Sequence, residues 1–179
     1  MRNRILTILL LGAMVSPAGA TVLVPASLTE LAHDARIIAR GHVVAVDGRW
    51  TDDRRTVETI VTLEAESYLK GQFGQTLQFR VPGGTLGRFR NIVMGAPRFE
   101  VGQRVVVFLG VTGPQVPYIL GLNQGVYRVD VDPSGQALVS PPPVMPGVTG
   151  PVVRGASSRQ PAPLAAFERE VRAVAGSAQ

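Results

Sequence analysis

The chain of 179 residues contains no cysteine and only two histidines, His33 and His42. A disulfide framework and a thiolate metal site are therefore excluded. A zinc or iron site recruits several His, Cys or carboxylate ligands at recognisable spacing, and no such motif is present. We therefore expect no metal and no other cofactor, and both histidines are interpreted as structural or surface residues.

The motifs of common catalytic sites are also missing. There is no G-x-S-x-G nucleophile elbow, and the glycine-rich segment Pro82–Gly87 lacks the Lys-Ser/Thr pair of a phosphate-binding loop. Thr21 precedes the first predicted element, whereas an amino-terminal nucleophile must be held by a base and an oxyanion hole. The sequence therefore predicts no catalytic residue.

Lysine is almost absent, since seventeen of the 18 basic residues are arginine and only Lys70 is lysine. The formal net charge is +5 against 13 acidic residues, and it falls to +3 without Arg2 and Arg4. This excess is too small for the electrostatic footprint of a nucleic-acid-binding protein. No nucleic-acid partner is expected.

A long apolar run occurs only at the amino terminus. Arg2 and Arg4 precede the apolar stretch Ile5–Val15, and Ala18–Ala20 matches an A-x-A cleavage site. The run of about eleven residues is shorter than a membrane-spanning helix requires. We interpret residues 1–20 as a signal peptide and expect a periplasmic or extracellular protein with no transmembrane segment after cleavage. An uncleaved amino-terminal anchor is the alternative.

Two short amphipathic helices are predicted at the ends of the mature chain. Ser27–Glu30 is a capping box, and apolar residues at helical spacing continue the helix from Leu28 to about Ala35. The second helix covers residues 164–175, in which Leu164, Phe167, Val171 and Val174 recur at helical spacing. A helix of this length is not stable alone, so we expect it to pack on the rest of the protein or on a partner.

Between the helices the pattern is that of short β-strands with turn signals. The predicted strands are Ile37–Val46, Val57–Ala65, Thr76–Val81, Arg104–Leu109, Tyr118–Leu122, Val126–Val131 and Ala137–Ser140. Strands separated by turns rather than helices favour an antiparallel sandwich or barrel. Closure protects strand edges, so we predict an all-β protein with short flanking helices, built as a small antiparallel Greek-key OB-like β-barrel.

The composition changes after Ser140, where proline and glycine become frequent. We interpret residues 141–163 as an extended linker because proline cannot donate regular backbone hydrogen bonds. The predicted organisation is therefore a signal peptide over 1–20, a barrel domain with its amino-terminal helix over 21–140, the linker, and the final helix over 164–175.

Several motifs carry a family resemblance. They are Ser27-Leu28, Ala35-Arg36-Ile37-Ile38, Gly41-His42-Val43, Leu69-Lys70-Gly71, Val81-Pro82-Gly83-Gly84, Gly95-Ala96-Pro97-Arg98-Phe99 and Val107-Phe108-Leu109. The series resembles a widespread family of uncharacterised exported bacterial proteins, and more remotely the netrin-like and tissue-inhibitor-of-metalloproteinase OB-folds. That resemblance implies the barrel fold. The inhibitors chelate a protease metal through an amino-terminal cysteine, and this chain has Thr21 there, so their mechanism is not expected.

The long connection over residues 82–99 is the candidate contact region, because binding usually lies on long loops of rigid barrels. It mixes glycine, arginine and apolar side chains. The candidate binding residues are Gly83, Gly84, Arg88, Phe89, Arg90 and Met94, with Ile92 and Val93 among the apolar residues. We hypothesise a non-enzymatic, exported protein-interaction module whose partner is another envelope or secreted protein.

Two other classes stay open. A hydrolase would use Asp52 and Asp53, or Glu58, Glu64 and Glu66, and would require these carboxylates to converge in a pocket with raised pKa values. The non-catalytic interpretation is that the three glutamates form an outer strand face and pair with Arg80 across strands. A structural envelope component would instead show a self-complementary apolar face.

Overall fold

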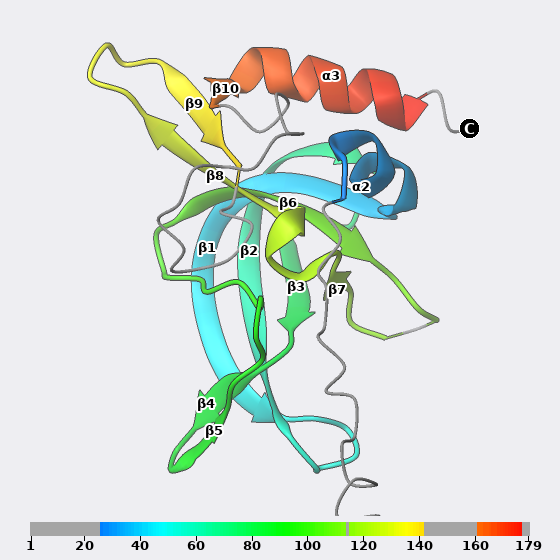
Figure 1. Ribbon diagram of the computed structural model, residues 1–179, viewed down its shortest axis with the longest axis vertical. Helices are drawn as coiled ribbons and strands as arrows, with labels where there is room; N and C mark the ends of the chain where they lie inside the picture. Colours follow the sequence, from blue (N-terminus) through cyan, green and yellow to red (C-terminus); the bar gives the residue numbers. More distant parts are fainter. Residues whose placement is uncertain (1–25, 114, 142–160, 177–179) are drawn as a thin grey trace, which may run out of the picture.

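The computed structural model describes residues 26–113, 115–141 and 161–176. The predicted signal peptide and residues 142–160 of the predicted linker lie outside these ranges. Five strands close into a barrel (Figure 1). They are β1 (Ile37–Trp50), β2 (Val57–Lys70), β3 (Thr76–Val81), β6 (Arg104–Gly110) and β7 (Tyr118–Ile119).

The hydrogen-bonded order of the barrel is β1-β2-β3-β7-β6, and β6 returns to pair with β1. This is the Greek-key arrangement of an OB-type barrel, and it confirms the predicted fold. One pair departs from the antiparallel prediction, since β3 and β7 run parallel and meet at Arg80 and Tyr118. A closed ring of five strands cannot alternate direction throughout because five is odd, so one neighbouring pair must be parallel.

The first two strands are longer than predicted. The prediction that the first strand ends at Val46 is wrong, because Asp47–Trp50 continues β1 and pairs with Val57–Ile60 of β2. Three register shifts interrupt the β1–β2 ladder. Such bulges increase the local twist, which helps two long strands to curl around a small barrel.

The sheet continues beyond the barrel. A 3-10 turn, η2 (Leu122–Gly125), leads into β8 (Val126–Val131), which pairs with β6 and with β9 (Ala137–Ser140). The strand predicted over Tyr118–Leu122 ends early because Gly121 and Leu122 adopt positive φ angles of 58° and 54°. The last strand, β10 (Ala162–Pro163), pairs with β9, so the end of the predicted linker is part of the sheet.

Two helices cover one face of this extension. They are α2 (Leu28–Asp34), which begins with the predicted capping box at Ser27, and α3 (Leu164–Gly176), which has the predicted bounds to within a residue. Figure 1 shows both helices on the side of the sheet away from the β4–β5 end. No helix in the described part of the chain is long and apolar enough to cross a membrane.

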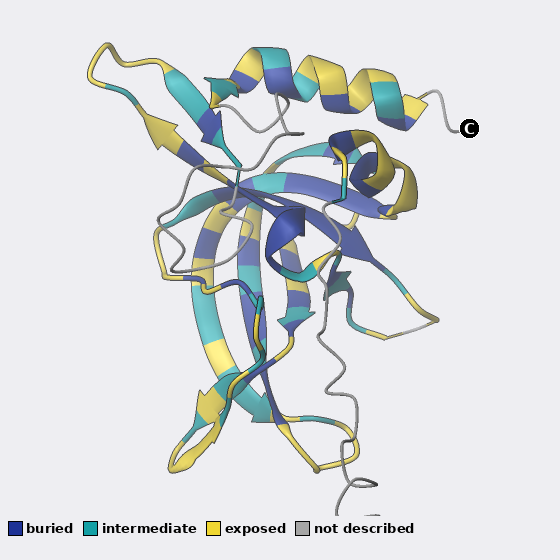
Figure 2. Cartoon of the chain, viewed as in Figure 1, coloured by how far each residue is buried: buried dark blue, intermediate teal, exposed yellow. Residues whose placement is uncertain are grey.

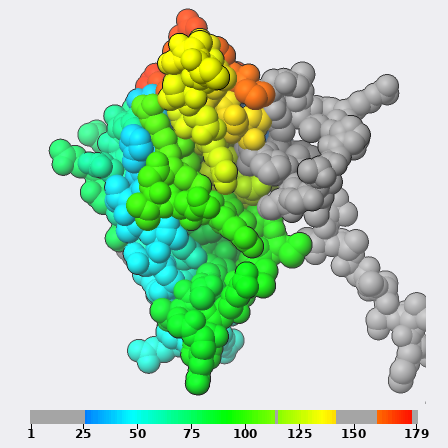
Figure 3. All heavy atoms as spheres, turned by 90° about the vertical axis from the view of Figure 1, so that its left-hand side faces the viewer, coloured from blue at the N-terminus to red at the C-terminus, as the bar shows by residue number. Residues whose placement is uncertain are grey.

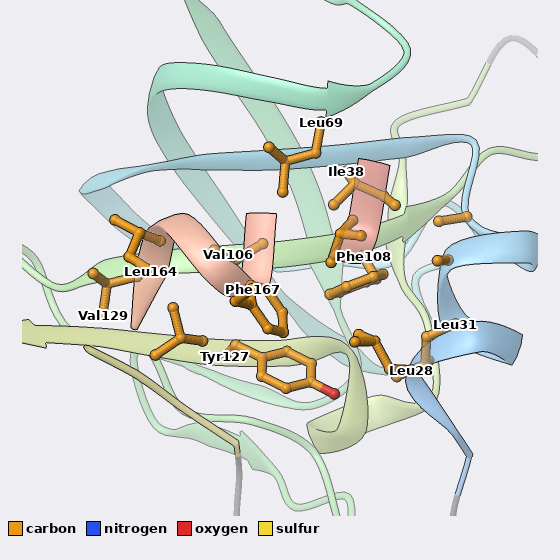
Figure 4. Close-up of a cluster of buried hydrophobic side chains, with 14 residues drawn as sticks. Leu28, Leu31, Ile38, Leu69, Val106, Phe108, Tyr127, Val129, Leu164 and Phe167 are labelled. Carbon is orange, nitrogen blue, oxygen red and sulfur yellow. The ribbon is translucent and has the colours of Figure 1, made fainter. Parts of the chain in front are cut away.

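The strand β6 is buried along nearly its whole length (Figure 2) and contributes to two hydrophobic cores. Its Val105, Val107 and Leu109 belong to the barrel core, whereas Val106 and Phe108 belong to the core beneath the helices. All five are fully buried, so this strand is covered on both sides. In the helix-side core, Phe108, Tyr127 and Phe167 pack as tilted rings, with centroids 5.5 Å and 4.9 Å apart (Figure 4).

The connection between β3 and β6 holds a feature that the sequence did not predict. Residues 84–91 form a two-stranded hairpin, β4 (Gly84–Leu86) with β5 (Phe89–Asn91), which is separate from the main sheet. The hairpin projects at one end of the barrel, beside the turn that joins β1 to β2 (Figure 1).

Candidate functional site

The β4–β5 hairpin lies against the β1–β2 ribbon by direct backbone contact. A Cβ atom built on Gly48 would lie 1.9 Å from the carbonyl oxygen of Thr85, and one on Gly84 would lie 2.6 Å from Thr59 Oγ1. The Thr59 hydroxyl donates a hydrogen bond of 2.7 Å to the carbonyl oxygen of Gly83. These contacts leave no room for larger side chains and hold the base of the hairpin on the ribbon.

This arrangement gives two of the predicted binding residues a different role. Gly83 is buried and has a φ of 82°, and Gly84 is half-buried against β2. Both residues position the hairpin, and neither presents a side chain. The glycine-rich pattern at these positions reflects the close packing of the backbone on the ribbon.

The other predicted residues lie on the exposed part of the hairpin and its continuation. Phe89, Ile92 and Met94 are 44%, 66% and 80% exposed, and Arg88 and Arg90 are exposed as well. Their segment, green in Figure 3, forms the lower tip of the molecule in that view. Solvent therefore reaches the four predicted residues that have side chains available for contact: Arg88, Phe89, Arg90 and Met94.

Trp50 joins this group from β1. Its ring packs edge-on against Phe89 with centroids 5.0 Å apart, and it remains 37% exposed. The guanidinium of Arg88 lies 5.2 Å from the centre of the Phe89 ring, within the range of a cation–π interaction. We name Trp50, Arg88, Phe89, Arg90, Ile92 and Met94 the hairpin surface.

Trp50 is absent from the predicted contact residues because the predicted first strand ends at Val46. The apolar pattern of the strand does stop there, since Asp47, Gly48 and Arg49 follow. A large aromatic side chain just before a turn was the available signal.

A cavity of about 300 Å³ lies at the base of the hairpin. It is lined by Thr51, Thr56, Val57, Glu58, Arg80, Pro82, Gly83, Asn91, Val93, Tyr118 and Ile119. Glu58 is only 7% exposed, so its interpretation as part of an outer strand face is wrong. Arg49 reaches the same carboxylate oxygen, Oε1, through both Nε and Nη2 at 2.9 Å, which compensates the buried charge.

The predicted pairing of the glutamates with Arg80 is also wrong. The Arg80 side chain donates instead to Gln115 Oε1 at 2.7 Å. Glu64 is exposed, and Glu66 contacts the side chains of Arg40 and His42 from β1 and of Arg104 from β6. The three carboxylates therefore have different surroundings, since Arg49 pairs with Glu58, Glu64 is exposed, and Glu66 lies at a register shift of the β1–β2 ladder.

Glu66 is the centre of an ion-pair network on the barrel wall. Its oxygens lie 2.9 Å from Arg40 Nε and 2.7 Å from His42 Nδ1, and Arg104 forms a bidentate pair with it. Burial raises the pKa of Glu66, but the hydrogen bond from Arg104 and the neighbouring positive charges outweigh this and leave the pKa below its usual value. Arg40 also bonds Glu168 of α3, which ties that helix to the barrel.

The acidic residues of the turn do not form a catalytic pair either. Asp52 is exposed, while Asp53 accepts hydrogen bonds from the Thr51 hydroxyl and the Arg55 amide. The Thr51 bond, followed by the Arg55 bond, holds the pKa of Asp53 below its usual value. A general acid requires the opposite shift. In residues 26–113, 115–141 and 161–176, no three His, Asp or Glu side chains are grouped so that they could hold a metal ion.

No family model, curated protein or solved structure matches this chain. Its function must therefore be inferred from its own residues, and the hairpin surface is the group that the structure brings together most clearly. The carboxylates of the hydrolase hypothesis are distributed over a turn, the hairpin base and the barrel wall.

Proposed function

We propose that this protein is an exported, non-enzymatic interaction module that contacts an envelope or secreted protein through the hairpin surface. The observation that carries the proposal is the exposure of Trp50, Phe89, Ile92 and Met94, together with two arginines, on a hairpin held against the barrel. Aromatic residues, Met and Arg are enriched in protein interfaces, and Trp and Arg are frequent among the residues that dominate binding energy.

The way the hairpin is held also supports this role. A contact surface binds more tightly when its conformation is set before binding, because less conformational freedom is then lost. The close backbone contacts at Gly48 and Gly84 supply such support, and the packing of Trp50 against Phe89 extends it to the side chains. A mobile loop of the same composition would lose more entropy on binding.

The alternatives have less support from the described residues. A hydrolase needs converging carboxylates with raised pKa values, whereas those of Asp53 and Glu66 are lowered. A structural component would associate with its own copies through the same apolar residues. The OB-type strand order is consistent with the proposed netrin-like resemblance, but the cysteine-dependent inhibition of zinc proteases is not part of the proposal.

The experiment is affinity capture from periplasm or medium with wild-type protein and with the double variant Ile92→Ala, Met94→Ala. Both side chains are more than half exposed, so we expect an unchanged free energy of unfolding and a large loss of captured protein. The matched control is Val101→Ala with Val131→Ala, which removes exposed apolar groups at 67% and 64% exposure elsewhere on the chain.

The proposal would be rejected if wild-type protein captured nothing reproducibly, or if both double variants lost the same proteins equally. Sedimentation of the purified protein separates the structural alternative. Concentration-dependent self-association that the hairpin variant abolishes would favour a structural role over contact with a different protein.

A further inference from the structure

The net charge of the chain resides in one continuous segment. Between Ser67 and Phe99 there are five basic residues and no Asp or Glu; the basic residues are Lys70, Arg80, Arg88, Arg90 and Arg98. Removing these five from the total of 18 leaves 13 basic residues against 13 acidic residues. The rest of the chain is therefore balanced, although the overall charge of +5 gives no sign of this distribution.

Three of the five, Arg88, Arg90 and Arg98, are exposed in the connection that carries the hairpin. None of them forms an ion pair with a carboxylate in the part of the chain that the structure describes. Other arginines are paired, since Arg49 bonds Glu58 and Arg104 bonds Glu66. The positive charge at the hairpin is thus left uncompensated, unlike that of the barrel wall.

The three consecutive residues from Arg88 to Arg90 are exposed, and beyond Arg90 exposed side chains alternate with less exposed ones. Arg88, Arg90, Ile92 and Met94 are exposed, whereas the intervening Asn91 and Val93 are only partly exposed and line the cavity at the hairpin base. Two guanidinium groups are therefore followed by two aliphatic side chains along one segment. A complementary partner needs carboxylates next to an apolar group.

We infer that the hairpin surface recognises an acidic protein segment that presents carboxylates beside an apolar side chain. This inference rests on the proposed function and specifies its partner. Arginine forms bidentate hydrogen bonds with carboxylates, and complementary charge accelerates association and rejects basic surfaces. The Arg88–Phe89 contact limits the freedom of one of these guanidinium groups before binding.

An anionic membrane is the other surface with this chemistry, and the number of cations argues against it. Segments that bind anionic lipid electrostatically carry clusters of about four to eight basic residues, more than the three arginines here. The apolar contribution is also divided between aromatic groups packed on each other and two aliphatic side chains. We therefore assign the surface to a protein.

The test places a photoreactive diazirine analogue of methionine at position 94 of the exported full-length protein. After illumination in the native periplasm or medium, mass spectrometry identifies the cross-linked peptide. The expected peptide has an excess of Asp and Glu and contains an apolar residue. The reversal Arg88→Glu with Arg90→Glu should reduce the cross-linking yield at least about tenfold, and rising salt should reduce it for the wild type.

The matched control is Arg128→Glu with Arg169→Glu, which changes the net charge equally at exposed arginines on β8 and α3. Its yield should stay within about twofold of wild type, because these side chains lie outside the hairpin surface. Reversing the acidic residues of the identified peptide to arginine should restore cross-linking to the Arg88→Glu, Arg90→Glu variant. Equal loss in both charge variants would overturn the inference.

Other outcomes separate this inference from the proposed function. A protein cross-link to a neutral or basic peptide, with no loss on charge reversal, would keep the proposed function and refute the acidic partner. Cross-linking to lipid, together with sedimentation of the protein on phosphatidylglycerol vesicles but not on phosphatidylcholine vesicles, would refute both. No cross-link to any molecule would likewise refute both.

Discussion

Substitution of Gly48 by alanine tests how closely the hairpin is held on the β1–β2 ribbon. The φ of Gly48 is not in the left-handed region, so alanine is compatible with its backbone and would by itself stabilise the protein by about 0.4–1 kcal/mol. The added Cβ would lie 1.9 Å from the Thr85 carbonyl oxygen, a backbone atom that cannot rotate away. Overpacking of this kind costs about 1–3 kcal/mol, so we expect a net loss of up to about 2.5 kcal/mol.

The assay is urea unfolding combined with hydrogen exchange at the hairpin amides. We expect a lower midpoint with an unchanged denaturant dependence, faster exchange in β4 and β5, and unchanged exchange in β6. Gly176→Ala is the control, because nothing lies within 4 Å of its added Cβ, and it should be neutral or slightly stabilising. If Gly48→Ala were as stable as wild type and equally protected at the hairpin, the close contact would be refuted.

Three further substitutions test the barrel wall and the helices. Glu66→Gln should lower the free energy of unfolding by about 1–3 kcal/mol at pH 7. Because folding lowers the pKa of Glu66, this difference from wild type should shrink as pH falls below about 4.5, and urea unfolding at several pH values measures it. Phe167→Ala should cost about 3 kcal/mol or more, whereas the exposed Arg169→Ala should stay within about 0.5 kcal/mol, as thermal and urea unfolding will show. Ser27→Ala should remove about 1 kcal/mol through loss of the capping box, with circular dichroism reporting the helix signal.

The strand pattern predicted the barrel because burial in this fold follows local periodicity. The strand Thr76–Val81 has the predicted bounds, and the capping box at Ser27 forms as predicted. These elements are determined by side chains within a few positions of each other. Local chemistry is then sufficient for their prediction.

Features that depend on distant residues were missed. The β4–β5 hairpin consists of two three-residue strands, too short for a periodic signal, and its position depends on Gly48, which lies far away in the sequence. The extension of β1 to Trp50 depends on its pairing with β2, since Asp47–Trp50 shows no apolar alternation.

The part of the candidate site that depends on local sequence was predicted, and the part that depends on distant contacts was not. Arg88, Phe89, Arg90 and Met94 could be selected because arginine and apolar residues are mixed in one long connection. Contacts between β4 and the β1–β2 ribbon determine the roles of Gly83 and Gly84 and bring Trp50 into the hairpin surface. These contacts join segments that are distant in the sequence, so no single segment predicts them. The burial of Glu58 likewise requires the hairpin above it and Arg49 beside it.

Because β6 contributes to both hydrophobic cores, it limits which substitutions and truncations the molecule tolerates. Neighbouring residues of this strand contribute to opposite hydrophobic clusters, so a shift of the strand by one position would put every side chain in the wrong cluster. Deletion of the carboxy-terminal helix would expose one side of a strand whose other side fills the barrel. Barrel and helix layer should therefore melt in one transition, and a truncated barrel should aggregate rather than survive as a smaller domain.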